Sequence, residues 1–147
     1  MNSDAYLRAA IEQARKSLSE GGIPIGSVLV HDGKIIGRGH NCRVQSGSAI
    51  DHGEMNCLRN AGRLGAGVYR GSTLYTTLSP CPMCSGAIVL YKIPRVVVGE
   101  NRTFLGAEDY LRSQGVEVEV LQDAECIELM TEFIRAQPAL WNEDIGI

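Results

Sequence analysis

The sequence contains no apolar stretch that approaches the roughly 18 residues a membrane-spanning helix needs. Its opening segment, MNSDAYLRAAIEQARKSL, lacks the basic start and apolar stretch of a secretory signal peptide. Repeats, low-complexity segments and flexible linkers between domains are also missing. We therefore expect residues 1–147 to form one domain in the cytoplasm, without a membrane partner.

Basic clusters and aromatic residues are scarce as well. The formal net charge is −3, and the sequence contains no run of Lys and Arg residues. Aromatic residues make up 5 % of the chain, so few rings are available to stack on unpaired bases. Proteins that follow a phosphate backbone usually carry a basic patch. The composition therefore argues against a nucleic-acid partner.

A disulfide framework is not indicated either. The five cysteines are an odd number, and a chain of 147 residues is larger than the small secreted domains that depend on such bonds. Two of the cysteines, Cys81 and Cys84, are three positions apart in the segment Pro80-Cys81-Pro82-Met83-Cys84. On one helical turn, both side chains would face the same way. The cysteine pattern favours metal binding or catalysis.

The hydrophobic pattern predicts helices that alternate with short strands. Expected helices cover residues 4–19, 52–60, 81–91, 108–114 and 124–136, and expected strands flank Asp32-Gly33 and cover 72–77, 95–100 and 116–121. Asp123 is expected to cap the last of these helices. The Asp-Gly pair between two apolar runs predicts a tight antiparallel hairpin. This order predicts an α/β fold, a three-layer α/β/α sandwich around a mixed five-stranded sheet. The tail that follows Pro138 is predicted to be irregular.

A second motif, His52-Gly53-Glu54, stands at another predicted helix start. His52 would complete a Cys₂His set with Cys81 and Cys84. Three protein ligands leave the fourth tetrahedral position open to water, which is typical of a catalytic zinc site. Helix N-termini favour negative groups, which suits two thiolates. The sequence therefore predicts one catalytic Zn²⁺ per chain.

The residue that would move protons is Glu54. It follows His52 by two positions, so on a regular helix it points to a different side and lies beside the metal rather than on it. A carboxylate there can take a proton from zinc-bound water and give it to a leaving nitrogen. H-x-E followed by P-C-x-x-C is the signature of zinc-dependent base deaminases. The two motifs together predict that chemistry.

Beyond the motifs, the sequence resembles the fungal-type cytosine deaminases of the cytidine-deaminase-like zinc hydrolase superfamily. The similar segments are GGIPIG (21–26), GRGHN (37–41), HGE (52–54), NAGRL (60–64), LYTTLSPCPMC (74–84), IPRVVVGEN (93–101) and W-x-E-D-I-G (141–146). The resemblance implies the cytidine-deaminase-like fold, a homodimer and a place in pyrimidine salvage. It also implies hydrolysis of cytosine to uracil and ammonia, in which zinc-bound hydroxide attacks C4 and Glu54 shuttles the protons.

The same resemblance implies which residues hold the substrate, a small nucleobase. Asn41 would hydrogen-bond the carbonyl edge of the ring, together with the backbone N–H of Gly53. The backbone carbonyl of Ser79 and the carboxylate of Asp144 would contact the amino group. Apolar side chains would form the rest of the pocket: Ile25, Leu78, Phe104 and Trp141. Residues 138–147 are expected to close over it as a lid.

Other functions stay open on the sequence alone. A deaminase of another free base or heterocycle, such as guanine, a modified pyrimidine or a pteridine-like ring, would keep the chemistry and change only the pocket. A nucleic-acid editor that flips a base into the pocket is disfavoured by the acidic balance of the chain. A module without enzymatic activity is a further alternative: the C-x-x-C pair alone could be a redox pair, or the cysteines could belong to a purely structural zinc site.

Overall fold

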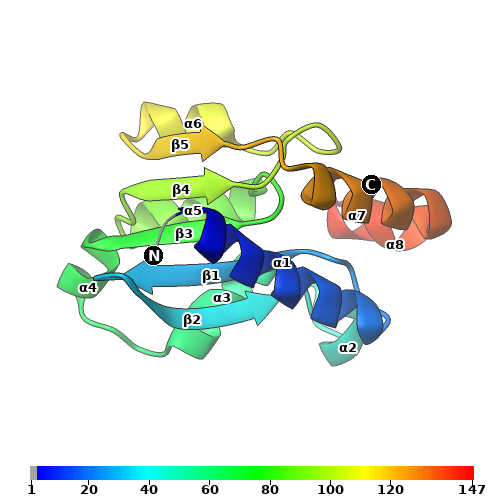
Figure 1. Cartoon of the computed structure of the whole chain (residues 1–147), viewed down its shortest axis with the longest axis horizontal. Helices are drawn as coiled ribbons and strands as arrows, with labels where there is room; N and C mark the ends of the chain where they lie inside the picture. The colour runs from blue at the N-terminus through cyan, green and yellow to red at the C-terminus, as the bar shows by residue number, and fades with distance from the viewer. Residues whose placement is uncertain (1–2) are drawn as a thin grey trace.

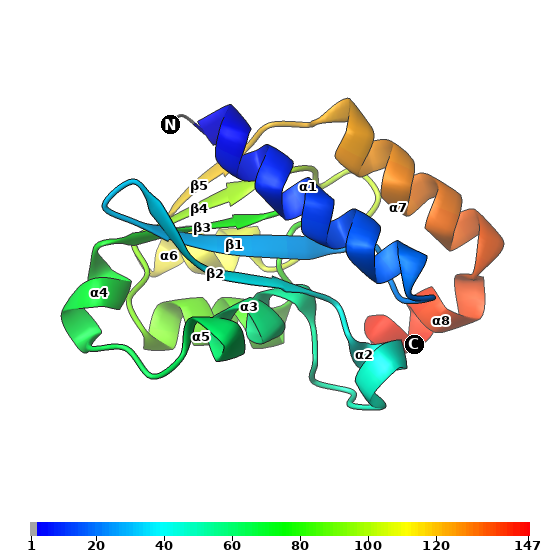
Figure 2. The same cartoon turned by 60° about the horizontal axis from the view of Figure 1, so that its bottom comes forward.

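The computed structural model describes residues 3–147 and shows a five-stranded sheet between two layers of helices (Figures 1 and 2). The strands are β1 (Gly26–His31), β2 (Lys34–His40), β3 (Ser72–Thr76), β4 (Arg95–Val98) and β5 (Glu117–Val120). They lie in the order β2-β1-β3-β4-β5, with β5 at the top of Figure 1. Strand β1 is antiparallel to both of its neighbours, and β3, β4 and β5 are parallel. The predicted α/β/α sandwich with a mixed sheet is confirmed.

Helices cover both faces of this sheet (Figure 2). On one face lie α1 (Ser3–Ser19) and α7 (Ala124–Ala136), and on the other lie α3 (Gly53–Ala61), α5 (Pro82–Leu90) and α6 (Glu108–Ser113). Successive side chains of a strand point to opposite faces, so β1 contributes to two separate cores. Val28 and Val30 pack in the core that includes Tyr6 of α1, whereas Leu29 packs with Cys57 of α3. The sheet is therefore buried on both sides.

Two local predictions are confirmed at the level of the backbone. Asp32 and Gly33 both have positive φ angles, 49° and 74°, as the tight turn between β1 and β2 requires. Helix α7 begins directly after Asp123, whose side chain accepts a hydrogen bond of 3.0 Å from the backbone N–H of Cys126. This carboxylate satisfies an otherwise free donor of the first turn.

The prediction of an irregular tail is wrong. Residues Pro138–Asp144 form a helix, α8, with Pro138 in its first turn. Proline is tolerated there because the first N–H groups of a helix have no partner within the helix and its fixed φ is already helical. Trp141 and Asp144 are buried on this short helix. Proline thus starts a helix here, where the sequence pattern suggested a break.

Two more short helices were not predicted. They are α2 (Arg43–Ser46) and α4 (Ala66–Arg70), each too short to show a helical repeat of apolar residues. Helix α2 lies next to α8 at the end of the sheet where β1 begins and β2 ends (Figure 2). None of the helices among residues 3–147 is long and apolar enough to cross a membrane.

Candidate active site

The three predicted metal ligands lie together at the ends of β2 and β3. The ligand atoms of His52, Cys81 and Cys84 are all within 4.8 Å of one another. His52 Nδ1 is 3.5 Å from Cys81 Sγ. His52 immediately precedes α3 and Cys81 immediately precedes α5, both with extended backbone. Two helix N-termini thus present the ligands to one point, where the helix dipoles favour negative charge.

These side chains fit a zinc ion. Zn²⁺ binds imidazole nitrogen and thiolate sulfur at about 2.0–2.3 Å, so neighbouring ligands of a tetrahedral ion are about 3.3–3.8 Å apart. The 3.5 Å between His52 Nδ1 and Cys81 Sγ is within that range. Within residues 3–147, no fourth His, Cys, Asp or Glu joins the group. A set of three leaves one coordination position open, as catalysis requires.

Glu54 lines the same pocket as His52, although two positions on a regular helix would separate them. The reason is that His52 stands just outside α3 with extended backbone, while Glu54 is in the first turn. Glu54 is only 4 % exposed, and burial raises the pKa of its carboxyl to about 7, with the charge of Cys81 adding to the effect. A carboxyl group with a pKa near neutrality is suited to both accept and donate protons.

The two ligand thiols differ in acidity before any metal binds. A hydrogen bond from Cys84 lowers the pKa of Cys81 to about 4, against the opposing effect of burial. The same hydrogen bond and burial raise the pKa of Cys84. Cys81 is therefore a thiolate at neutral pH, which is the form that binds zinc.

A narrow pocket of about 10 Å³ opens on this group. Its lining residues are Ile25, His52, Glu54, Leu78, Ser79, Cys81, Phe104, Trp141, Asp144 and Ile145. The ring centroids of Phe104 and Trp141 lie 5.6 Å apart in an edge-to-face arrangement. The structure thus brings the predicted apolar walls together in one place. Ile145 was missed, because an apolar residue in a tail thought to be irregular gives no signal of its own.

Asp144 in the tail lies beside one metal ligand and is hydrogen-bonded to Asn41. Asp144 Oδ1 is 3.6 Å from His52 Nε2 and accepts a hydrogen bond of 2.8 Å from Asn41 Nδ2. Asn41 Oδ1 in turn accepts from the backbone N–H of Arg43 at 3.0 Å. Burial raises the pKa of Asp144, opposed by the His52 charge and the Asn41 hydrogen bond. Asn41 does not line the pocket in this arrangement, so its contact with a base stays a prediction.

Arg43 also lies beside the site, although the sequence does not indicate it. Its Nε atom lies 4.0 Å from Asp144 Oδ1 and donates to the Ala49 carbonyl at 2.9 Å. The guanidinium therefore adds positive charge beside the buried carboxylate of the tail. A single arginine after Cys42 gives no recognisable signal in the sequence, because only the position of α8 brings the two groups together.

Gly53 allows close packing of the α3 start against the pocket wall. A Cβ atom at this position would lie 3.1 Å from the Ile25 carbonyl oxygen and 3.2 Å from Ile25 Cγ2. Glycine avoids this crowding, as expected where two backbone segments approach closely. The first turn of α3 is thereby held against the segment before β1.

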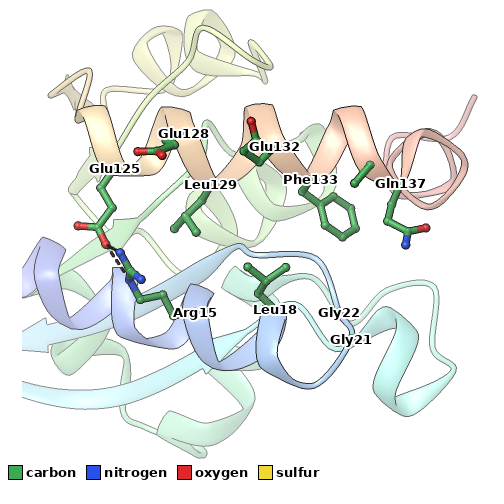
Figure 3. Close-up of a pocket in the computed structure, with 11 residues that line it drawn as sticks. Arg15, Leu18, Gly21, Gly22, Glu125, Glu128, Leu129, Glu132, Phe133 and Gln137 are labelled. Atoms are coloured by element: carbon green, nitrogen blue, oxygen red, sulfur yellow. Dashed lines mark hydrogen bonds and ion pairs between the residues drawn. The ribbon is translucent and has the colours of Figure 1, made fainter.

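A larger cavity of about 550 Å³ lies elsewhere, between α1 and α7 (Figure 3). Its floor includes Leu18, Leu129 and Phe133, and Arg15 pairs with Glu125 at one end. None of the three metal ligands lines it. The chemistry therefore belongs to the smaller pocket at the strand ends, where ligands of open α/β sheets commonly bind.

Comparisons with known proteins agree with this geometry. Residues 1–100 match the model of the cytidine and deoxycytidylate deaminase zinc-binding region. The chain belongs to this family of zinc deaminases. A cytosine deaminase of Candida albicans (strain SC5314) is 58 % identical over 141 residues, which cover 95 % of this chain and 94 % of that protein.

More distant relatives share the fold and act on other molecules. A tRNA-specific adenosine deaminase of Streptococcus pyogenes serotype M18 is 43 % identical over 88 % of both chains. A solved structure from a study of A-to-I editing by tRNA:A34 deaminases superimposes with a TM-score of 0.74 at 28 % identity, covering 86 % of this chain and 99 % of the other. The fold and the family are therefore established together.

Proposed function

We propose that this protein is a zinc-dependent deaminase of free cytosine that produces uracil and ammonia. The observation that carries the proposal is the set of His52, Cys81 and Cys84 beside the buried carboxyl of Glu54, in one small pocket. The identity of 58 % with the Candida albicans cytosine deaminase supports cytosine as the base.

Proton transfer is the task of Glu54 in this mechanism. When held by His52, Cys81 and Cys84, zinc supplies Lewis-acid activation of a water molecule. Glu54 takes a proton from the attacking water and delivers it to N3 of the ring. It then passes the second water proton to the exocyclic nitrogen, which leaves C4 as ammonia. The atoms balance, because cytosine and water give uracil and ammonia.

The remaining residues would bind and orient the ring. The amide of Asn41 and the backbone N–H of Gly53 would face its carbonyl edge, and the Ser79 carbonyl and Asp144 would face its amino group. The second N–H of Asn41 Nδ2 remains available, because Asp144 takes only one. The apolar side chains that line the pocket, Ile25, Leu78, Phe104 and Trp141, would exclude water and contact the ring.

A free base suits this pocket better than a nucleotide within a strand. Phe104 and Trp141 both line it, packed edge to face, and the formal net charge of −3 offers no general attraction for phosphates. The related tRNA deaminases act on nucleic acid, so this distinction must be tested directly. We propose that the protein has no nucleic-acid partner.

We further propose that residues 1–147 form one domain and that residues 138–147 act as its lid. Burial of Trp141 and Asp144 against the pocket supports the lid. A homodimer is supported by exposed apolar side chains near α3 and α5, namely Ile50, Leu90 and Tyr91. A cytoplasmic location and a role in pyrimidine salvage complete the proposal.

Ammonia release from a panel of free bases, with zinc measured in the same samples, tests the function. We expect one zinc per chain and turnover of cytosine ahead of guanine, adenine and pterin-like rings. Faster turnover of another base would replace cytosine in the proposal. Zinc without ammonia from any base would indicate a non-enzymatic zinc module. Tight binding of single-stranded RNA at low salt would contradict the free-base proposal.

A further inference from the structure

A buried carboxylate on α6 holds the segment that leads from β3 to the zinc ligands. Glu108 is 3 % exposed, and its Oε2 atom accepts a hydrogen bond of 2.6 Å from the Ser79 hydroxyl. Its Oε1 atom accepts from Asn101 Nδ2 at 3.2 Å. Ser79 is 2 % exposed and lines the pocket, whereas Glu108 does not. The carboxylate thus acts on the pocket only through the serine.

The Ser79 hydroxyl is fixed from two directions. While it donates to Glu108, its oxygen accepts the backbone N–H of Gly106 at 2.9 Å. The Ser79 backbone N–H donates to the Glu100 carbonyl at 3.0 Å. These three hydrogen bonds restrain both the side-chain rotamer and the backbone orientation of the serine.

The two carbonyl groups of this segment differ in their partners. The Pro80 carbonyl accepts the backbone N–H of Ala107 at 2.9 Å and the hydroxyl of Ser85 at 3.2 Å. The Ser79 carbonyl accepts none of the hydrogen bonds found among residues 3–147. A buried carbonyl without a partner is unusual, and a ligand with an N–H donor would satisfy it. The exocyclic amino group of cytosine is such a donor.

The loop from 99 to 107 is joined to the same segment. A Cβ atom on Gly106 would lie 2.0 Å from the Pro80 carbonyl oxygen, so the two backbones touch and only glycine fits. At the other end of the loop, the fully buried carboxylate of Glu100 accepts the backbone N–H groups of Arg102 at 2.7 Å and Thr103 at 3.0 Å. Between these two anchors lies Phe104, the aromatic wall of the pocket.

We propose that Glu108 is a positioning residue that, through the Ser79 hydroxyl, holds the Ser79 carbonyl where it accepts the amino group of the base. The proposal rests on the proposed function, because it assumes that the substrate is a ring with an amino group. The Ser79 carbonyl would distinguish such a ring from one that lacks the amino group. Glu108 itself touches neither the ring nor the metal ligands. Its effect is to prevent the Ser79–Pro80 peptide from turning its carbonyl away from the pocket.

Two ligands that differ at one position test this role. Cytosine carries the amino group at C4, and pyrimidin-2-one has hydrogen there. In Glu108→Ala we expect KM for cytosine to rise about tenfold, the effect of losing one well-formed hydrogen bond. The inhibition constant of pyrimidin-2-one against cytosine turnover should change less than about twofold, because that ring has no amino group to place. Zinc should remain at one per chain.

Three further variants make the test specific. Glu108→Gln keeps an acceptor for the Ser79 hydroxyl and should restore most of the affinity for cytosine. Ser79→Ala should reproduce the effect of Glu108→Ala, and the double variant should be no worse than either single one, since both remove the same contact. Glu117→Ala removes an exposed carboxylate on β5 and should leave both constants unchanged.

The outcome separates this proposal from the proposed function. Equal weakening of cytosine and pyrimidin-2-one in Glu108→Ala would mean general distortion of the pocket and would overturn the positioning role. An unchanged KM in Ser79→Ala would overturn it as well. If Glu108→Ala fails to fold, Ser79→Ala still provides the test, because it removes only a hydroxyl. Absence of cytosine turnover in the unaltered protein would instead refute the proposed function.

Discussion

The metal side and the base side of the pocket are built in different ways. The metal side comes from two short motifs, each at the start of a helix. One motif contains His52 and Glu54, and the other contains Cys81 and Cys84. The base side is assembled from segments far apart in the chain: the segment before β1, the segment after β3, the loop after β4 and helix α8. The metal set therefore depends on local geometry, and the base contacts depend on the whole fold.

This difference suggests that the reaction and the choice of substrate are separable. A zinc ion and a proton-transferring carboxylate can act on several heterocycles that carry an amino group. In the proposed function, the choice of ring would depend on Ile25, Phe104, Trp141 and Asp144, which line the pocket beside the metal ligands and would not perform the chemistry. Changes on the metal side should remove activity, whereas changes on the base side should alter affinity and leave zinc in place.

The largest effect is expected from Cys81→Ala. Removal of one of three ligands should lower zinc far below one per chain and abolish turnover. It should also reduce the melting temperature, because metal binding stabilises only the folded state. Metal analysis, activity and thermal unfolding measure these changes. Cys42→Ala is the matched control, because this half-buried thiol is outside the ligand group. Full zinc content in Cys81→Ala would refute the ligand assignment.

Glu54→Gln comes next and separates the metal from proton transfer. The amide has nearly the same shape but cannot carry protons, so kcat should fall by about 10²–10⁴ while zinc stays at one per chain. Glu128→Gln on the surface of α7 should keep full activity. Residual turnover above about one tenth of the original value would show that another group transfers the protons.

A chain ending at Gln137 tests the base side with a smaller effect on the metal. It lacks Trp141 and Asp144, so KM for cytosine should rise at least about tenfold while zinc is retained. Loss of the buried indole should also lower stability by about 3–5 kcal/mol. Asp144→Asn should raise KM less than the truncation does, because it keeps the shape of the side chain and leaves Trp141 in place. Loss of zinc in proportion to affinity would contradict a separate lid.

The sequence was most informative where a local rule determines the structure. The Asp32-Gly33 turn, the Asp123 cap and the alternation along the strands predicted the sheet and its layers. The metal set was predictable for the same reason, because the spacing of Cys81 and Cys84 is itself a local rule. These elements require no knowledge of which segments meet in space.

Other features depended on tertiary contacts and were not predictable. Helix α8 forms where proline suggested a break, because Trp141 on its buried face packs against the pocket. Glu108 reads as an ordinary acidic residue at a helix start, and only the approach of α6 to Ser79 gives it a buried partner. Ile145 and Arg43 were not predictable either, because only the position of α8 in the fold brings them to the site.

The order in which the strands pair has a consequence for biosynthesis. After the β1–β2 hairpin, each new strand lies beside one made earlier: β3 beside β1, β4 beside β3, and β5 beside β4. Strands β1 to β4 and the starts of α3 and α5, which carry the metal ligands, are all present once residue 100 has been made. The aromatic cover and α8 emerge from the ribosome afterwards. The topology therefore permits zinc to enter before the pocket is closed, so loading needs no reopening of the finished protein.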